Sequence, residues 1–275
     1  MLLPYLILIC IVGFAIYWLL KPAIKRYYTR KVFNKEFPPA WLEYLYTRIP
    51  LYQRLPTHLQ RELQGHINVF IADKEFIGCE DLVITDEIRV TIAAQACILL
   101  LNRPSQYYPT LKTIIVYPSA YIAKTIEQDG PLEETDLQVR LGESWLNGPV
   151  VLSWDHAKHG ASDIYDAKNV VLHEFAHQLD GEDGSCDGVP ALSAHSNYVS
   201  WARVCSKQYS KLVKDVERGT PTTIDAYGAT NPAEFFAVVT ETFFEKPLQL
   251  KKKHPALYQH MQGYYKVDPI EWLHQ

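Results

Sequence analysis

Two histidines four residues apart are the residues of this sequence with the clearest capacity for chemistry. The segment 170–180 reads VVLHEFAHQLD and contains His173, Glu174 and His177 in the pattern H-E-x-x-H. On an α-helix, residues four apart lie on one face, so both imidazoles can bind a single Zn²⁺. Glu174 can then reach a water at that metal. The pattern alone does not make a catalytic site, because such a zinc also needs a third protein ligand.

A buried helix must position these residues. Apolar side chains such as Leu172, Phe175 and Leu179 occur on more than one side of the segment, and Gly181 is suited to end it. We therefore expect a helix over 170–180 that is buried in the protein. Histidines on such a helix need partners.

A second helix is predicted to supply the third ligand. Asn231 is a good N-cap and Pro232 a good first residue for a helix that runs to about Glu245 and is rich in Phe and Val. Glu234 and Glu241 lie two turns apart on this apolar helix, and a buried carboxylate needs a partner. We interpret Glu234 as the third ligand of a His₂Glu zinc site, and Glu241 as an acceptor for the other N–H of a ligand imidazole.

Other assignments remain open at this point. Glu234 is the third helical residue, where a glutamate can form a capping box. Asp225 is the rival ligand, because Thr223–Gly228 resembles the Asp-bearing motif of the aspzincins, although it is one residue short. His195 is available but lies in a polar loop. A metzincin is excluded, because Asp180 and Asp183 occupy the positions of its required Gly and His.

Composition limits the possible classes of protein. The chain has 275 residues, 48% of them hydrophobic and 21% charged, which is typical of a folded protein. Its formal net charge of -4 gives no indication of nucleic-acid binding. Five cysteines without C-x-x-C spacing do not suggest a disulfide framework or a cysteine-based zinc site. A reducing compartment fits this usage.

The N-terminal segment is predicted to be a membrane anchor. Residues 2–20 carry no charge and are almost all apolar, and a helix of that length is close to the thickness of a bilayer. Basic residues follow at once, namely Lys21, Lys25, Arg26, Arg30 and Lys31. This predicts a single-pass membrane protein with its catalytic domain in the cytoplasm. A cleaved signal peptide is the alternative, but the basic start and the cleavage site are missing. We expect an anchor at 1–26 and one domain at 27–275.

The rest of the chain predicts an α+β fold that is mostly helical, with a small sheet. Residues 114–118 form a short buried strand ended by proline. Residues 139–145 and 149–154 suggest a hairpin, and Pro149 favours an edge strand for its second arm. An edge strand beside the zinc site can hold an extended peptide, whereas the alternative is a purely structural hairpin. The acidic, glycine-rich segment 181–188 lacks the register of a calcium loop, so we expect a solvated loop.

Several motifs together resemble a known family. HEFAHQLD at 173–180, IDAY at 224–227 and PAEFFAV at 232–238 are similar to segments of the Mlc titration factor A family of zinc metallopeptidases, as are GESW at 142–145 and GPVVLSW at 148–154. The resemblance covers roughly residues 40–273. It implies a zincin-type metallopeptidase domain, similar to the catalytic domain of anthrax lethal factor.

The resemblance also implies roles for individual residues and a function. His173, His177 and Glu234 would hold Zn²⁺, Glu174 would be the general base, and Tyr227 would lie near the scissile carbonyl. The expected activity is zinc-dependent hydrolysis of a peptide or protein substrate, aminopeptidase-like in kind. The family name comes from binding a transcriptional repressor. The alternative function is therefore a regulatory protein that sequesters such a regulator and whose zinc site is not catalytic. Soluble members of the family lack the hydrophobic N-terminal segment.

Overall fold

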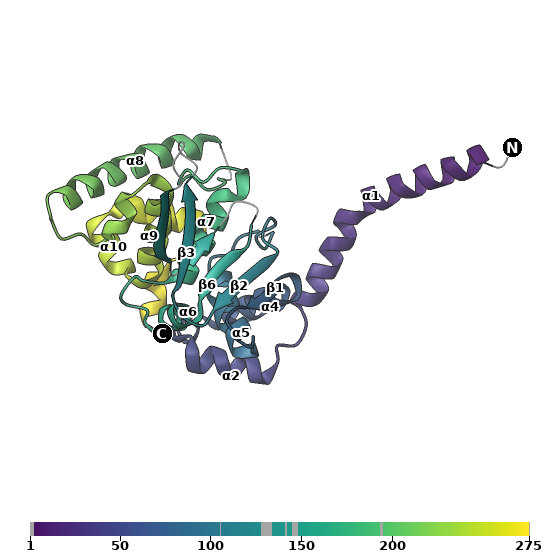
Figure 1. The fold of residues 1–275 in the computed structure, drawn as a ribbon, viewed down its shortest axis with the longest axis horizontal. Helices are drawn as coiled ribbons and strands as arrows, with labels where there is room; N and C mark the ends of the chain where they lie inside the picture. The colour runs from purple at the N-terminus through teal and green to yellow at the C-terminus, as the bar shows by residue number, and fades with distance from the viewer. Residues whose placement is uncertain are drawn as a thin grey trace.

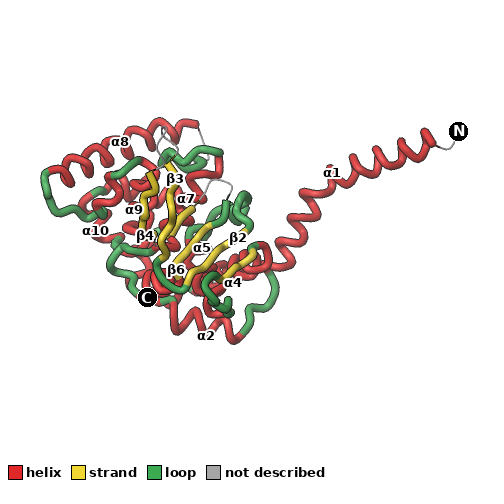
Figure 2. Tube along the Cα trace, in the orientation of Figure 1, coloured by secondary structure: helices red, strands yellow, loops and turns green. Residues whose placement is uncertain are grey.

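The computed structural model describes residues 3–104, 106–127, 134–140, 142–144, 148–192 and 195–274. Most of this part is helical, and its strands gather in the middle of the domain (Figures 1 and 2). The helices are α1 (Leu3–Phe33), α2 (Pro39–Arg48), α3 (Pro50–Gln53), α4 (Thr57–Asp73), α5 (Asp86–Ile98), α6 (Trp154–Ser162), α7 (Val170–Asp180), α8 (His195–Glu217), α9 (Pro232–Glu245), α10 (Pro247–Lys253) and α11 (Pro255–Tyr265). The 3₁₀ turns are η1 (Gly181–Asp183), η2 (Ala226–Ala229) and η3 (Pro269–His274). The strands are β1 (Glu75–Gly78), β2 (Thr113–Tyr117), β3 (Tyr121–Glu127), β4 (Glu134–Arg140), β5 (Gly142–Ser144) and β6 (Val150–Ser153).

The main sheet has the order β1-β2-β6-β5. The first three strands are parallel, and β5 runs antiparallel to β6. Every residue of β6 is buried, which is characteristic of a strand covered on both faces. Strands β3 and β4 form a separate antiparallel pair. The expected α+β fold, mostly helical with a small sheet, is confirmed.

The prediction that the strand after Pro149 lies at the edge of the sheet is wrong. Strand β6 lies between β2 and β5, and β5 occupies the edge. Pairing with β2 begins at Val150, opposite Ile114, so proline comes before the first paired residue and its missing N–H removes no bond from the ladder. The first arm of the predicted hairpin is divided between β4 and β5. The turn at 146–148 lies largely outside the described residues.

Helix α1 projects away from the rest of the molecule (Figure 1). Its C-terminal end contacts α4, where a side chain added to Gly65 would lie 2.6 Å from the ring of Phe33. Within the described part of the chain, no helix has both the length and the apolar character needed to cross a membrane. The predicted transmembrane helix at 2–20 thus gains no support, and several of its side chains lie outside the described residues.

Helix α7 lies in the hydrophobic core. Phe175 is fully buried, and its ring centroid lies 5.6 Å from that of Phe70 in α4 and 4.8 Å from that of Tyr108. The Tyr108 hydroxyl in turn donates to the carbonyl of Ala96 in α5, at 2.6 Å. Three aromatic rings and a buried hydrogen bond therefore fix the face of α7 opposite its histidines.

We expect Phe175→Ala to lower the free energy of unfolding by about 3–5 kcal/mol, because it removes a buried ring and leaves a cavity. Urea denaturation in the presence of EDTA measures this loss without any contribution from a metal. Val199→Ala is the control, since Val199 is 66% exposed and should change stability by no more than about 0.5 kcal/mol. Equal losses in the two variants would contradict the packing described here.

Candidate metal centre

Local capping and packing hold α7 in place. The side chain of Asn169 caps the helix by accepting from the Leu172 N–H at 3.0 Å. All apolar residues of α7 after Val170 are buried, whereas the side chains of His173 and His177 keep 14% and 13% of their surface exposed. The helix predicted at 170–180 is confirmed, and its two histidines border the solvent.

Helix α9 begins as its sequence predicts. Asn231 accepts from the Glu234 N–H at 2.9 Å, and Pro232 is the first helical residue. Residues 235–245 are all buried. The Glu234 side chain is 17% exposed, and its carboxylate contacts the two histidines rather than serving as a capping box.

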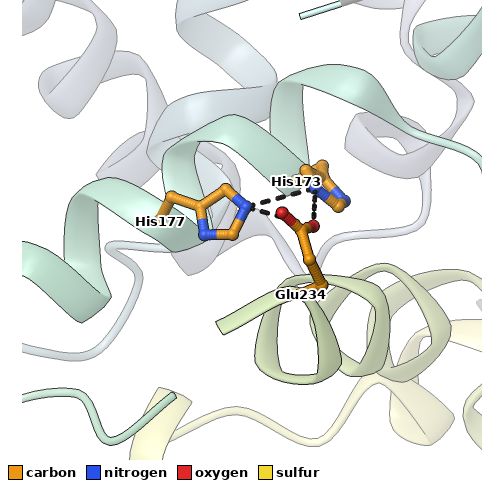
Figure 3. A group of neighbouring side chains, drawn as sticks. All are labelled: His173, His177 and Glu234. Atoms are coloured by element: carbon orange, nitrogen blue, oxygen red, sulfur yellow. Dashed lines mark hydrogen bonds and ion pairs between the residues drawn. The ribbon is translucent and has the colours of Figure 1, made fainter. Parts of the chain in front are cut away.

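The side chains of His173, His177 and Glu234 converge from the two helices (Figure 3). Glu234 Oε2 lies 2.9 Å from His173 Nε2 and 3.4 Å from His177 Nε2, and the two nitrogens are 3.2 Å apart. Ligands held tetrahedrally at zinc bond lengths of ~2 Å lie about 3.3 Å from one another. Both the donor types and their spacing therefore fit one small divalent cation.

Glu241 orients His173. Its Oε1 lies 2.8 Å from His173 Nδ1. A carboxylate only accepts, so the imidazole donates through Nδ1 and directs Nε2 to the cluster. Burial lowers the pKa of His173, but hydrogen bonds to Glu234 and Glu241 outweigh burial and leave it well above its usual range. Burial conversely raises the pKa of Glu234, and the two histidines bring it down to about 2. Without a metal, the cluster thus favours a protonated imidazole beside a carboxylate.

Asn169 and Glu245, which the sequence analysis did not single out, complete this network. Glu241 Oε2 also accepts from the backbone N–H of Asn169, and Glu245 Oε1 accepts from the Asn169 side chain at 3.0 Å. Asn169 Nδ2 reaches the carbonyl of Gly160 as well, at 2.9 Å. The i, i+4 spacing of Glu241 and Glu245 on an apolar helix was the available signal. The partner of these two glutamates is Asn169, the N-cap of α7, which lies more than 70 residues away in sequence.

The remaining predicted site residues lie at different distances from the cluster. Glu174 is buried in α7 next to His173, with 5% of its surface exposed. Tyr227 lies in η2 and is 55% exposed, and its ring centroid is 5.9 Å from that of His173. Asp225 is exposed, accepts from the Tyr227 N–H at 2.9 Å and does not belong to the three-residue group. His195 begins α8, and its side chain lies outside the described residues.

Another group of possible ligands lies near the surface. His159, Asp163 and Asp166 have ligand atoms within 4.8 Å of one another. Both aspartates also accept backbone N–H groups of their own loop, from Tyr165 and Lys168. This group is accounted for by the turn that leads into α7.

Comparison with known proteins agrees with the geometry. A family model described as glucose-regulated metallo-peptidase M90 matches residues 24–266. An uncharacterized protein of Synechocystis sp. is 44% identical over 243 residues, covering 88% of each chain. Mlc titration factor A of Yersinia pestis and that of Yersinia pseudotuberculosis are each 30% identical over 244 residues, covering 86% of this chain and 88% of theirs. The chain therefore belongs to the M90 family of metallopeptidases, the family of Mlc titration factor A.

Proposed function

We propose that this protein is a zinc-dependent peptidase in which His173, His177 and Glu234 hold the metal. The observation that carries the proposal is the convergence of two imidazole nitrogens and one carboxylate oxygen within 4.8 Å. A set of two nitrogens and one oxygen is a common protein ligand set of catalytic zinc, and it leaves a coordination position for substrate or water. Glu241 supports the site as the acceptor that orients one ligand imidazole.

Glu174 and Tyr227 have separate roles in the proposed hydrolysis of the peptide bond. When bound, Zn²⁺ polarises the scissile carbonyl and lowers the pKa of a water. Glu174 takes a proton from the attacking water and delivers it to the leaving amine as the C–N bond breaks. Tyr227, exposed and near the His173 ring, donates its hydroxyl hydrogen to the oxyanion of the tetrahedral intermediate. The burial of Glu174 limits the competing access of bulk water.

We further propose aminopeptidase-like specificity, with Asp225 as the group that pairs with the free α-amine of the substrate. Asp225 is an exposed carboxylate two residues before Tyr227. Asp225 accepts from the backbone N–H of Tyr227, whose ring centroid lies 5.9 Å from that of His173, so Asp225 is close in the chain to a residue beside the site. A carboxylate in this position attracts a positively charged amino terminus.

A second function is favoured by the name of the Yersinia relatives, which describes them as titrating Mlc. The corresponding proposal for this chain is a protein that sequesters a transcriptional regulator. The two functions differ in what they require of Glu174, because a metal site that only stabilises a binding surface needs no base beside it.

We also propose that the uncharged segment 2–20, several of whose side chains lie outside the described residues, attaches the protein to a membrane in a single pass, with the catalytic domain in the cytoplasm. Large apolar side chains of α1 are exposed, including Phe14 at 67%, Trp18 at 67% and Leu19 at 76%. Burying such surface in lipid is favourable, and the basic residues that follow favour the cytoplasmic side.

Glu174→Gln should retain zinc and lower peptidase activity by about 10²–10⁴-fold, because glutamine is nearly isosteric but cannot take a proton. Glu234→Ala should instead lose zinc, since two protein ligands remain. Zinc content and hydrolysis of a peptide panel, each measured with and without chelator, separate these outcomes. Hydrolysis at the wild-type rate by Glu174→Gln would rule out its role as base. A wild-type protein that holds zinc but cleaves no peptide of the panel would favour the sequestering function.

Asp225→Asn should raise KM for peptides with a free amino terminus and leave KM for N-acetylated peptides unchanged. Asparagine keeps the oxygen that accepts from the Tyr227 N–H, so η2 should be preserved. Steady-state kinetics on matched free and acetylated peptides give both values. An equal change for the two substrates would show that Asp225 does not recognise the α-amine.

Removing residues 1–26 should release the protein from the membrane fraction. The full-length chain should stay in membranes washed with carbonate at high pH, which removes peripheral proteins, whereas the shortened chain should be soluble. In sealed cytoplasm-out vesicles, added protease should degrade the domain. Protection of the domain would contradict the orientation, and full-length protein in the soluble fraction would contradict attachment.

A further inference from the structure

We propose that Asp180 and Gly188 are positioning residues that set the separation between His177 on α7 and Glu234 on α9. The inference rests on the metal site proposed above. The loop that follows α7 thereby supports the metal site, although none of its residues belongs to the group of metal ligands.

Asp180 is the last residue of α7, three positions after His177, and is fully buried. Its Oδ2 accepts from the backbone N–H of Gly188 at 2.9 Å, while its Oδ1 has no hydrogen-bond partner among the described residues. Burial raises the pKa of this carboxyl to about 6. A desolvated carboxylate with one unpaired oxygen is costly. The role of the Asp180 side chain is therefore its hydrogen bond to the Gly188 N–H.

Gly188 is the residue that brings this loop against α9. Its φ of +79° is in the left-handed region, and a Cβ at this position would lie 2.3 Å from the carbonyl oxygen of Pro232. Any side chain would therefore force the loop and the start of α9 apart. The carbonyl of Gly188 also accepts from the indole N–H of Trp201, a buried residue of α8, at 3.2 Å. Gly188 is fixed through both its N–H and its carbonyl.

The position of this contact explains its effect on the ligands. Pro232 lies two residues before Glu234, so the loop connects the end of α7 that carries His177 to the start of α9 that carries Glu234. At the other end of α7, Asn169 is bonded to Glu241 and Glu245 in the second half of α9. The two helices are therefore tied on both sides of the metal ligands. A shift at either tie changes distances that metal coordination tolerates only within a few tenths of an ångström.

The first test compares Gly188→Ala with Gly184→Ala in the full-length protein. Gly184 also has a positive φ, of +98°, but a Cβ there would meet no atom within 4 Å. Both variants place alanine in a strained backbone conformation, and only Gly188→Ala pushes on Pro232. Zinc affinity from chelator competition should fall by about 10–100-fold in Gly188→Ala, the usual range for residues that support ligands. Gly184→Ala should match the wild type.

The second test replaces Asp180 and remains informative if Gly188→Ala does not fold. Asp180→Leu removes the acceptor together with an unpaired buried carboxylate. It should weaken zinc binding while leaving the melting temperature of the metal-free protein unchanged or higher. Asp180→Asn removes the same charge but keeps an oxygen for the Gly188 N–H, so it should bind zinc as tightly as the wild type. The visible spectrum of the Co²⁺-substituted protein should change in Asp180→Leu and not in Asp180→Asn.

The outcomes separate the two proposals. A wild-type protein that binds no zinc would overturn the metal site itself. A wild type that binds zinc, with equal affinities in Gly188→Ala and Gly184→Ala or in Asp180→Leu and Asp180→Asn, would overturn the positioning role alone. Loss of zinc by Asp180→Leu in parallel with a loss of its metal-free stability would also overturn it, because a purely structural residue would give that result.

Discussion

The pairing of His173 with two glutamates of α9 is the interaction on which the site depends. Helix α9 is otherwise rich in Phe and Val and largely buried, so its carboxylates would be costly if left unpaired. His173 contacts Glu234 through Nε2 and Glu241 through Nδ1, and thereby serves both. This double contact fixes the orientation of the ring, with Nδ1 toward Glu241 and Nε2 toward Glu234. It also requires that α7 and α9 pack directly against each other, as the many contacts between them show.

The surrounding structure makes that arrangement rigid. One face of α7 is held by Phe70 and Tyr108 through Phe175, and its start is held by Asn169. Because protein interiors are closely packed, side chains on such a helix have little freedom to move. The site is therefore prepared by the fold before any cation arrives, which reduces the reorganisation that binding requires. A metal ion would replace the proton that His173 holds in the metal-free cluster.

Membership of the M90 family suggests peptide hydrolysis, whereas the name Mlc titration factor A suggests sequestration of a regulator. The geometry bears on them through two residues that do not belong to the ligand group. Glu174 and Tyr227 lie next to the ligands, one buried and one exposed, and hydrolysis has a use for both. Sequestration of a regulator has no need of a general base such as Glu174. The two functions are therefore compatible in one molecule and separable by substitution.

The sequence by itself determined what depends on neighbours within a few residues. Helices α7 and α9, the Asn231 cap of α9 and the i, i+4 placement of His173 and His177 follow from local geometry, and the structure has them at the predicted positions. Glu234 was picked out because a carboxylate on an apolar helix needs a partner. The sequence could not decide which partner, since Asp225 offered the same chemistry. Only the packing of α9 on α7 places Glu234 against both histidines and leaves Asp225 exposed.

Contacts between segments distant in sequence decided the strand order of the sheet and the role of Gly188. Pro149 suggested an edge strand, but the order of a sheet depends on strands distant in sequence, and β5 takes the edge instead. Segment 181–188 read as a solvated loop, which describes most of it, yet Gly188 is buried against Pro232. No local pattern distinguishes a glycine needed for a turn from one needed for a close approach between segments more than 40 residues apart. That distinction exists only once the chain has folded, because the contact that defines it is tertiary.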